Sequence, residues 1–144
     1  MHLNSTYDPN NIFAKILRDE IPCWKVYEDA HALAFLDIFP QGPGHTLVIP
    51  KIAAIDFLTF PADAFGPYMA SLQHVARGVR KAFQADGITL SQFNGAASGQ
   101  TVFHLHFHII PRHEGVALIG HGKSGSAEAK TLEQHRDAII AAIG

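Results

Sequence analysis

Three histidines at alternating positions are the residues of this chain best suited to chemistry. His104, His106 and His108 are separated by single large apolar residues. In a β-strand, alternate side chains share a face, so the three imidazoles would point one way and the apolar residues between them the other. The segment 102–110 is rich in aromatic and branched residues, and Pro111, which cannot extend a central ladder, closes it. This pattern predicts a strand with one buried and one reactive face.

The residues alone allow two chemical interpretations of this face. Neutral imidazoles can bind a metal ion, or one histidine can be a nucleophile whose orientation and protonation the others control. A lone histidine in a strand is usually structural, but three at alternate positions after a glycine-rich segment, 94–99, favour a functional role. The metal interpretation is weaker, because no acidic residue or cysteine accompanies the histidines at a familiar spacing.

Length and composition restrict the class of protein. A chain of 144 residues can bury the core of one domain. With 47% hydrophobic residues, 17% charged residues and a net charge of -2, we expect a compact soluble protein that binds no nucleic-acid polymer. The single cysteine, Cys23, excludes an internal disulfide and fits a reducing cytoplasm. No segment resembles a membrane helix, and the polar start is not a signal peptide, so we expect a cytoplasmic protein without a membrane partner.

Hydrophobic periodicity predicts the elements around the histidines. We expect one helix from Asp8-Pro9 to just before Ile21-Pro22, a long helix within 62–85, and a terminal helix that starts at a capping box of Thr131 and Gln134. The expected strands are 25–28, 32–38, 45–49, 88–93 and 101–110. They follow one another as an antiparallel meander rather than as βαβ units, and the glycine-rich segment 114–125 is expected to be a mobile arm.

The segment HLHFHII resembles the His-φ-His-φ-His-φ-φ signature of the histidine triad superfamily, where φ is apolar. The similarity includes IFAKILRDEIPCWKVYEDAHALAFLDIFPQGPGHTLVIPK and NGAASGQTVFHLHFHIIPR, and so covers most of residues 11–112. The resemblance implies an α+β fold with a five-stranded antiparallel sheet and two main helices, in a homodimer whose sheets join into one of ten strands. We expect a histidine triad (HIT) domain at 11–112, with a C-terminal arm and helix, 113–144, packed on it.

The resemblance also implies reaction at the α-phosphorus of a nucleotide. His106 resembles the nucleophile that forms a nucleotidyl-histidine intermediate, and His104 the member that supports it. His108 and His45 would donate hydrogen bonds to phosphate oxygens. The positions that match residues near the leaving group, through side chains or backbone N–H groups, are Gln100, Thr101 and Val102. This scheme requires no metal and no cofactor.

The nucleoside side of the implied site also has matching residues. Asp37 matches a carboxylate that accepts both ribose hydroxyls, and Asn94, or its neighbour Phe93, matches a residue that precedes the glycine loop. The apolar residues that match the slot around a purine are Ile12, Phe13, Ile16, Phe35 and Ile38. Ordinary core packing is the alternative role of these apolar side chains.

One departure from the family pattern concerns zinc. Many bacterial relatives carry Cys-x-x-Cys and a further histidine that bind a structural zinc together with the first histidine of the triad. Those three positions are Asn11, Ala14 and Ala53 here. We therefore expect no zinc site of the family type.

These features lead to an expected function with stated alternatives. The expected activity is that of a purine nucleoside phosphoramidase, which cleaves the P–N bond of adenosine 5′-phosphoramidates and releases AMP. The alternatives are a dinucleoside polyphosphate hydrolase, since GQTV before the triad also occurs in that branch, a nucleotide-binding or interaction module with incidental catalysis, and a metalloprotein. The segment 115–126, including His121, is expected to shape the leaving-group pocket in the dimer.

Overall fold

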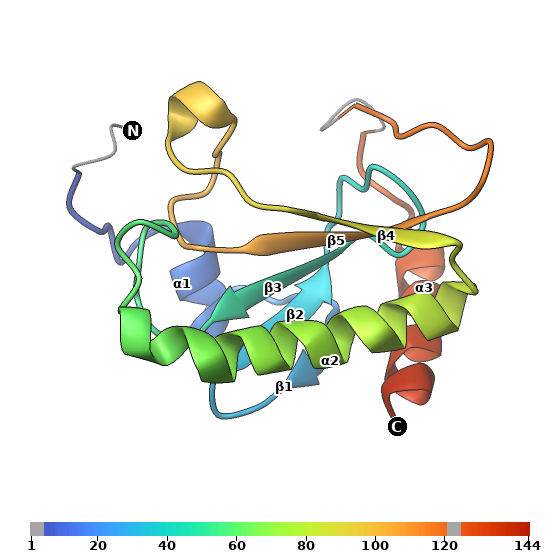
Figure 1. Ribbon diagram of the computed structural model, residues 1–144, viewed down its shortest axis with the longest axis horizontal. Coiled ribbons are helices and arrows are strands. Elements are labelled where there is room, and N and C mark those ends of the chain that lie inside the picture. Colours follow the sequence, from blue (N-terminus) through green and yellow to red (C-terminus); the bar gives the residue numbers. More distant parts are fainter. Residues whose placement is uncertain (1–4, 121–124) are drawn as a thin grey trace.

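The computed structural model describes residues 5–120 and 125–144, and within these ranges it forms one five-stranded sheet and three α-helices (Figure 1). The helices are α1 (Ile12–Leu17), α2 (Phe65–Phe83) and α3 (Ala129–Ile143). The strands are β1 (Lys25–Glu28), β2 (Ala32–Leu36), β3 (Thr46–Pro50), β4 (Gly87–Ser91) and β5 (Phe107–Arg112). Short 3₁₀ turns lie at Ala62–Ala64 and Ala96–Ser98. The expected α+β class and antiparallel five-stranded sheet are confirmed.

The sheet has the order β1-β2-β3-β5-β4, and every neighbouring pair is antiparallel. The first three strands form a meander, whereas β5 inserts between β3 and β4. This insertion brings His108 of β5 opposite Leu47 of β3 and Ser91 of β4. The histidine strand is therefore central in the sheet, with a neighbour on each side.

Alternate residues of the central strands pack on opposite faces of the sheet, as a period of two requires. On one face, residues such as Val48 and Ile109 join a large core with α2 and α3. On the other face, residues such as Phe35 and Leu47 pack with Phe13 of α1. Figure 1 shows α2 running along the first face, with α3 near the C-terminal end of α2. The sheet is thus covered on both sides, and α1 covers the smaller, second core.

The structure corrects the expected histidine strand. Strand β5 begins at Phe107, so only His108 of the three histidines lies in it, while His104 and His106 lie in an irregular segment before it. In that segment the Leu105 N–H donates to the carbonyl of Ala54, in the loop after β3, instead of joining the ladder. At the other end Pro111 lies inside β5, because the pairing with β3 stops at Ile109 and Pro111 pairs with β4 alone.

The helix starts also differ from the sequence-based expectation. Helix α1 begins after Asn11, whose side chain accepts the N–H groups of Phe13 and Ala14 at 3.1 and 2.9 Å, and not at Asp8. Helix α3 begins at Ala129 with no side-chain cap, so the expected capping box does not form. Strands β2, β3 and β4 differ from their expected bounds by one or two residues at one or both ends. Local turns thus shift boundaries that periodicity alone cannot fix.

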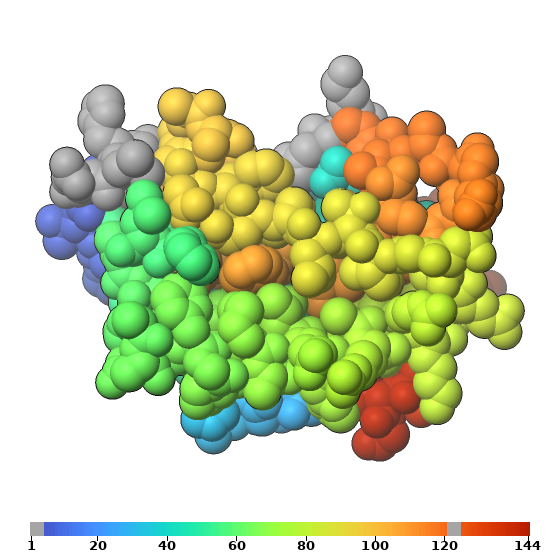
Figure 2. Space-filling model, in the orientation of Figure 1, coloured from blue at the N-terminus to red at the C-terminus, as the bar shows by residue number. Residues whose placement is uncertain are grey.

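The C-terminal region packs on the rest of the chain. Helix α3 lies against α2, where Gly78 leaves room for Ile143. In the arm, Ile119 exchanges two hydrogen bonds with Gln41, of 3.0 and 3.2 Å. Figure 2 shows the arm, in orange, standing out from the surface beyond β4. His121, expected to shape the leaving-group pocket, lies outside the described residues. Among the residues described, no helix has the length and apolar character needed to cross a membrane.

Candidate active site

A cavity of about 680 Å³ lies between α1, the end of β2 and the histidine segment. Most of the residues expected to form the nucleotide site line this cavity. They are Ile12, Phe13, Ile16, Phe35, Asp37, Ile38, Thr101, Val102, His106 and His108. The lining is mainly apolar at α1 and β2 and polar beside the histidines. This division suits a ligand with a flat apolar part and a charged part.

His106 is held in one tautomer by the backbone. Its Nδ1 lies 2.7 Å from the carbonyl oxygen of His104, and a carbonyl can only accept, so Nδ1 carries the proton. In the neutral ring, Nε2 then carries the lone pair. Phe13 packs edge-on against the imidazole, with ring centroids 4.9 Å apart, and fixes its plane. His106 therefore has the tautomer that attack through Nε2 requires.

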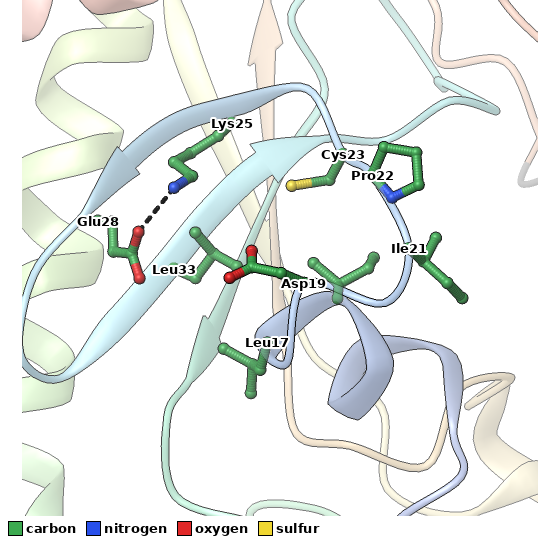
Figure 3. Close-up of a pocket in the computed structure, with 9 residues that line it drawn as sticks. Leu17, Asp19, Ile21, Pro22, Cys23, Lys25, Glu28 and Leu33 are labelled. Carbon is green, nitrogen blue, oxygen red and sulfur yellow. Dashed lines mark hydrogen bonds and ion pairs between the residues drawn. The ribbon is translucent and has the colours of Figure 1, made fainter.

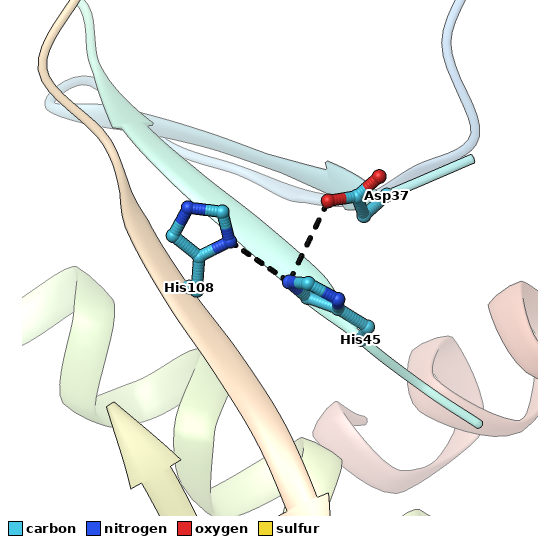
Figure 4. Close-up of side chains that lie close together, drawn as sticks. All are labelled: Asp37, His45 and His108. Atoms are coloured by element: carbon cyan, nitrogen blue, oxygen red, sulfur yellow. Dashed lines mark hydrogen bonds and ion pairs between the residues drawn. The ribbon is translucent and has the colours of Figure 1, made fainter. Parts of the chain in front are cut away.

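A chain of hydrogen bonds fixes the protons of His45 and His108 in the same way (Figure 4). The Gln41 N–H donates to Nδ1 of His45 at 3.0 Å, so the ring proton of His45 lies on Nε2. That Nε2–H donates to Nδ1 of His108 at 2.9 Å. His108 must then carry its own proton on Nε2. The chain therefore gives His108, which lines the cavity, an N–H that can donate to an anionic ligand.

Asp37 lies at the cavity end of this chain. One carboxylate oxygen is 3.5 Å from Nε2 of His45, and the other accepts the N–H of Phe39 at 2.8 Å. The backbone N–H fixes the carboxylate at the end of β2, where it lines the cavity. A fixed carboxylate in this position is an acceptor suited to the hydroxyl groups of a ligand.

Asp37, His45 and His108 also have the donor types of a metal site, since their ligand atoms lie within 4.8 Å of one another. A metal ion would need the lone pair of His45 Nε2. The Gln41 N–H at Nδ1 places the ring proton on that same Nε2. The backbone therefore favours a hydrogen-bond chain over a metal centre at these three residues.

His104 does not reach the cavity. Its ring is completely buried, with Nε2 2.9 Å from the Pro50 carbonyl and Nδ1 2.7 Å from the hydroxyl of Tyr7. Burial lowers the pKa of the His104 imidazole, and the bond to Pro50 opposes this shift. A neutral His104 contacts the site through its carbonyl, which binds His106. Sequence patterns gave no sign of Tyr7, because the contact joins residues that lie far apart in the chain.

Gln100 and Asn94 lie outside the lining of the cavity. Gln100 is 3% exposed, and its amide donates to the carbonyls of Ile55 and Val102 and accepts the Gly95 N–H. The Asn94 side-chain oxygen accepts the N–H of Phe57 at 2.9 Å. These contacts hold the loop before the histidines in place. Contact of either side chain with a nucleotide stays a prediction.

The lining of the cavity includes two residues without an expected role in binding. Trp24 and Arg136 both line it, and the Arg136 guanidinium lies 5.3 Å from the centre of the Trp24 ring. Arg136 comes from α3, so the C-terminal helix completes the wall. The sequence offered no sign of this, because the position of α3 depends on its packing against α2 and β1.

A second cavity, of about 380 Å³, lies beside α1 and β1 (Figure 3). Its lining includes Cys23, Lys25 and Glu28, and the Lys25 ammonium donates to the Glu28 carboxylate at 2.8 Å. Burial raises the pKa of the Cys23 thiol, while Lys25 acts in the opposite direction. A protonated thiol is a poor nucleophile, so this cavity lacks the reactive groups of the first.

Comparison with known proteins agrees with this geometry. The family described as the HIT domain matches residues 18–115, so the chain belongs to the histidine triad (HIT) family. Members of this family are generally nucleotide-binding hydrolases or transferases.

Three similar proteins illustrate the range of the family. A Hit-like protein of Bartonella henselae, described as involved in cell-cycle regulation, is 52% identical, with a TM-score of 0.87 over 95% of this chain and 99% of that one. A zinc-bound histidine triad protein of Mycobacterium smegmatis is 34% identical, with a TM-score of 0.80 over 93% of each chain. An adenylylsulfatase of Arabidopsis thaliana, HINT3, is 39% identical over 77% of this chain and 56% of its own length.

Proposed function

We propose that this protein is a purine nucleoside phosphoramidase, which hydrolyses the P–N bond of adenosine 5′-phosphoramidates and releases AMP. The observation that carries the proposal is the bond from His106 Nδ1 to the His104 carbonyl, which leaves the lone pair on Nε2 of a residue that lines the cavity. A neutral imidazole with its lone pair toward a bound phosphate is an activated nucleophile at neutral pH.

The cavity supports a nucleoside as the bound part of the substrate. The apolar side chains from α1 and β2, Ile16 and Phe35 among them, can hold the faces of a purine. Asp37, at the end of the same strand, can accept the two ribose hydroxyls. With the ribose at Asp37, which lies 3.5 Å from the ring of His45, the 5′-phosphate would lie beside the histidines.

The reaction would take place in two steps. In the first, the Nε2 lone pair of His106 attacks the α-phosphorus, the P–N bond breaks, and the amine leaves with a proton taken from solvent. In the second, water attacks the same phosphorus, the P–Nε2 bond breaks, the water returns a proton to solvent, and AMP leaves with His106 restored. One water is consumed, and AMP and the free amine are formed.

His108 and the backbone would stabilise the charge that develops on phosphorus oxygens. The His108 Nε2–H, fixed by His45, can donate to a non-bridging oxygen in both steps. Thr101 and Val102 line the cavity and can add backbone N–H or hydroxyl donors near the leaving group. A single preorganised donor of this kind contributes about 3 kcal/mol to transition-state stabilisation.

A second candidate substrate is adenylyl sulfate. One relative carries the name adenylylsulfatase, and it is 39% identical over 111 residues. The attack on the α-phosphorus would be the same, with sulfate rather than an amine as the leaving group. Sulfate needs no added proton, so this substrate would depend less on a proton donor.

The test is release of AMP from adenosine 5′-phosphoramidate by wild-type protein, the His106→Ala variant and a control His31→Ala variant, whose histidine is exposed. We expect turnover by wild type and control, and a loss of about a thousandfold or more in His106→Ala. Rapid quenching and mass spectrometry should detect a nucleotidyl adduct in wild type and in the control, and none in His106→Ala. No turnover of the phosphoramidate, or equal rates in the His106→Ala variant, would refute the proposal. Faster release from adenylyl sulfate or diadenosine polyphosphates would identify the alternative substrates.

A further inference from the structure

We propose that Tyr7 is a positioning residue for the nucleophile, acting through His104 on the orientation and tautomer of His106. This inference rests on the proposed function for its catalytic consequence. Its structural part, that the phenol helps to hold the His104 ring and through it the carbonyl that binds His106, stands on geometry alone.

The contact between Tyr7 and His104 has a defined donor and acceptor. The two rings meet edge-on, with centroids 5.7 Å apart, and the hydroxyl oxygen lies 2.7 Å from Nδ1. Because the Pro50 carbonyl at the other nitrogen can only accept, Nε2 carries the His104 proton. Nδ1 is therefore the acceptor and Tyr7 the donor. Each nitrogen of the completely buried His104 ring has a hydrogen-bond partner, and only this tautomer satisfies both partners.

The fixed ring of His104 in turn fixes the carbonyl that binds His106. The His104 carbonyl accepts Nδ1–H of His106 at 2.7 Å, and this bond determines where the lone pair of His106 lies. The peptide group has no ladder partner from a strand, since β5 begins only at Phe107. The N–H of the same peptide group, that of Leu105, donates to the Ala54 carbonyl at 2.8 Å. The position of the His104 carbonyl thus depends on this bond together with the bonds of the His104 side chain, and Tyr7 provides one of the two bonds at that ring.

The turn that carries Tyr7 also supports His106 directly. The Asp8 carbonyl accepts the Asn11 side chain at 2.7 Å, and Asn11 caps α1 through the N–H groups of Phe13 and Ala14. Phe13, at the start of that helix, packs edge-on against His106. One short segment, 7–13, therefore contacts both histidines, and its own hydrogen bonds hold the two contacts at a fixed separation.

The same segment does not fit the zinc site implied by the family resemblance. Asn11 and Ala14 stand where many bacterial relatives have cysteines, and here they form the cap of α1 and a buried apolar contact. Ala53 stands in place of the third ligand and offers no donor atom. Both nitrogens of His104 have protein partners, Tyr7 and Pro50. The Tyr7 hydroxyl thus holds His104 here, whereas a zinc ion holds the corresponding histidine in those relatives.

The test compares Tyr7→Phe, which removes only the hydroxyl, with a matched control, Tyr27→Phe. Tyr27 also donates its hydroxyl to one side chain, that of Asp29, away from the cavity. On adenosine 5′-phosphoramidate we expect Tyr7→Phe to lower kcat about tenfold to a hundredfold, because the nucleophile is misplaced. KM should stay within about twofold, since Tyr7 does not line the cavity. The control should match wild type in both constants.

A second measurement is independent of activity. Two-dimensional ¹H–¹⁵N spectra of the histidine rings report which nitrogen carries each proton. In wild type we expect the proton of His104 on Nε2 and that of His106 on Nδ1, whereas Tyr7→Phe should give His106 a mixture of tautomers. Unchanged tautomers in Tyr7→Phe, or an unchanged kcat, would overturn the inference. If wild-type protein turns over no nucleotide, the proposed function fails and the tautomers alone decide the role of Tyr7.

Discussion

The histidines His45, His104 and His106 each bind a backbone group that determines which ring nitrogen carries the proton. For His106 and His104 this group is a carbonyl, of His104 and Pro50 respectively, and for His45 it is the Gln41 N–H. Backbone groups do not titrate, so the fold determines which nitrogen of each neutral ring carries the proton. An array of neutral imidazoles, each with an assigned donor and acceptor, suits phosphoryl transfer better than metal binding.

At the same scale, Asp37 provides a test of how the nucleoside is held. Replacing Asp37 by Asn substitutes an amide for a charged acceptor, and a hydrogen bond to a charged group contributes about 1.5–3 kcal/mol. We expect Asp37→Asn to raise KM for an adenosine phosphoramidate about tenfold or more and to change kcat less. Steady-state kinetics on the ribose substrate and on its 2′,3′-dideoxy analogue measure this effect.

The analogue is the control that separates ribose binding from a general disturbance of the site. Wild-type protein should prefer the ribose substrate, and Asp37→Asn should lose most of that preference. If the variant kept the full preference for ribose, Asp37 would not be the acceptor of the hydroxyl groups.

At the scale of elements, the sequence predicted the helices and strands whose hydrophobic pattern is long and regular. Helix α2 follows its apolar spacing, and the alternating residues of β2 and β3 are buried on both faces as strands. The histidine segment misled the prediction, because alternation continues from His104 to His108 although only His108 lies in the ladder. Alternation specifies which side chains are buried, but hydrogen bonds from distant loops, such as Leu105 to Ala54, decide where a strand begins.

The residues of the candidate site also differ in whether the sequence could predict them. Residues that match a motif, such as Asp37 and His106, could be named from the sequence and do line the cavity. Tyr7 and Arg136 could not, because each reaches its contact through the packing of a separate element. Gln100 could be named, but its bonds to Ile55 and Gly95 depend on how two loops meet.

The turn between β1 and β2 offers a test of stability against pH. Asp29 accepts hydrogen bonds from the side chains of Tyr27 and Ser71 and from the N–H groups of His31 and Ala32, and it thereby ties this turn to α2. Burial alone would raise the pKa of Asp29, but these hydrogen bonds outweigh it and lower the pKa from 3.8 to about 2.

A carboxyl group with a lowered pKa in the folded state stabilises the fold above its unfolded pKa. We therefore expect wild-type protein to lose the contribution of Asp29 as the pH falls from about 4 to about 2. Asp29→Asn should be less stable at pH 7 and should lose less stability over that interval. Urea unfolding at several pH values measures both effects, with the exposed Asp63→Asn as control. Equal acid sensitivity in wild type and Asp29→Asn would contradict this role.

At the scale of the whole molecule, the two edges of the sheet differ in their fitness for pairing with a second copy. Edge strand β1 carries the charged Lys25 and Glu28, contains an irregularity in its pairing, and packs against α3. Charges and bulges on an edge oppose further pairing. Edge strand β4 instead carries Leu90, which is 50% exposed, and pairs directly with the histidine strand β5. The ten-stranded dimer expected from the family resemblance would therefore form through β4.

Substitution of Leu90 by Glu tests this arrangement. The side chain is half exposed in the single chain, so the change should affect folding little, whereas a dimer through β4 would place a charge in its interface. Light scattering after size exclusion should give wild type twice the chain mass of 15.7 kDa and Leu90→Glu a single chain. The control is Leu58→Glu, which changes a leucine 64% exposed in a loop and should remain dimeric. A dimeric Leu90→Glu protein would exclude β4 as the interface. Because Ser91 of β4 pairs with His108 of β5, a monomeric Leu90→Glu protein should also show a lower kcat.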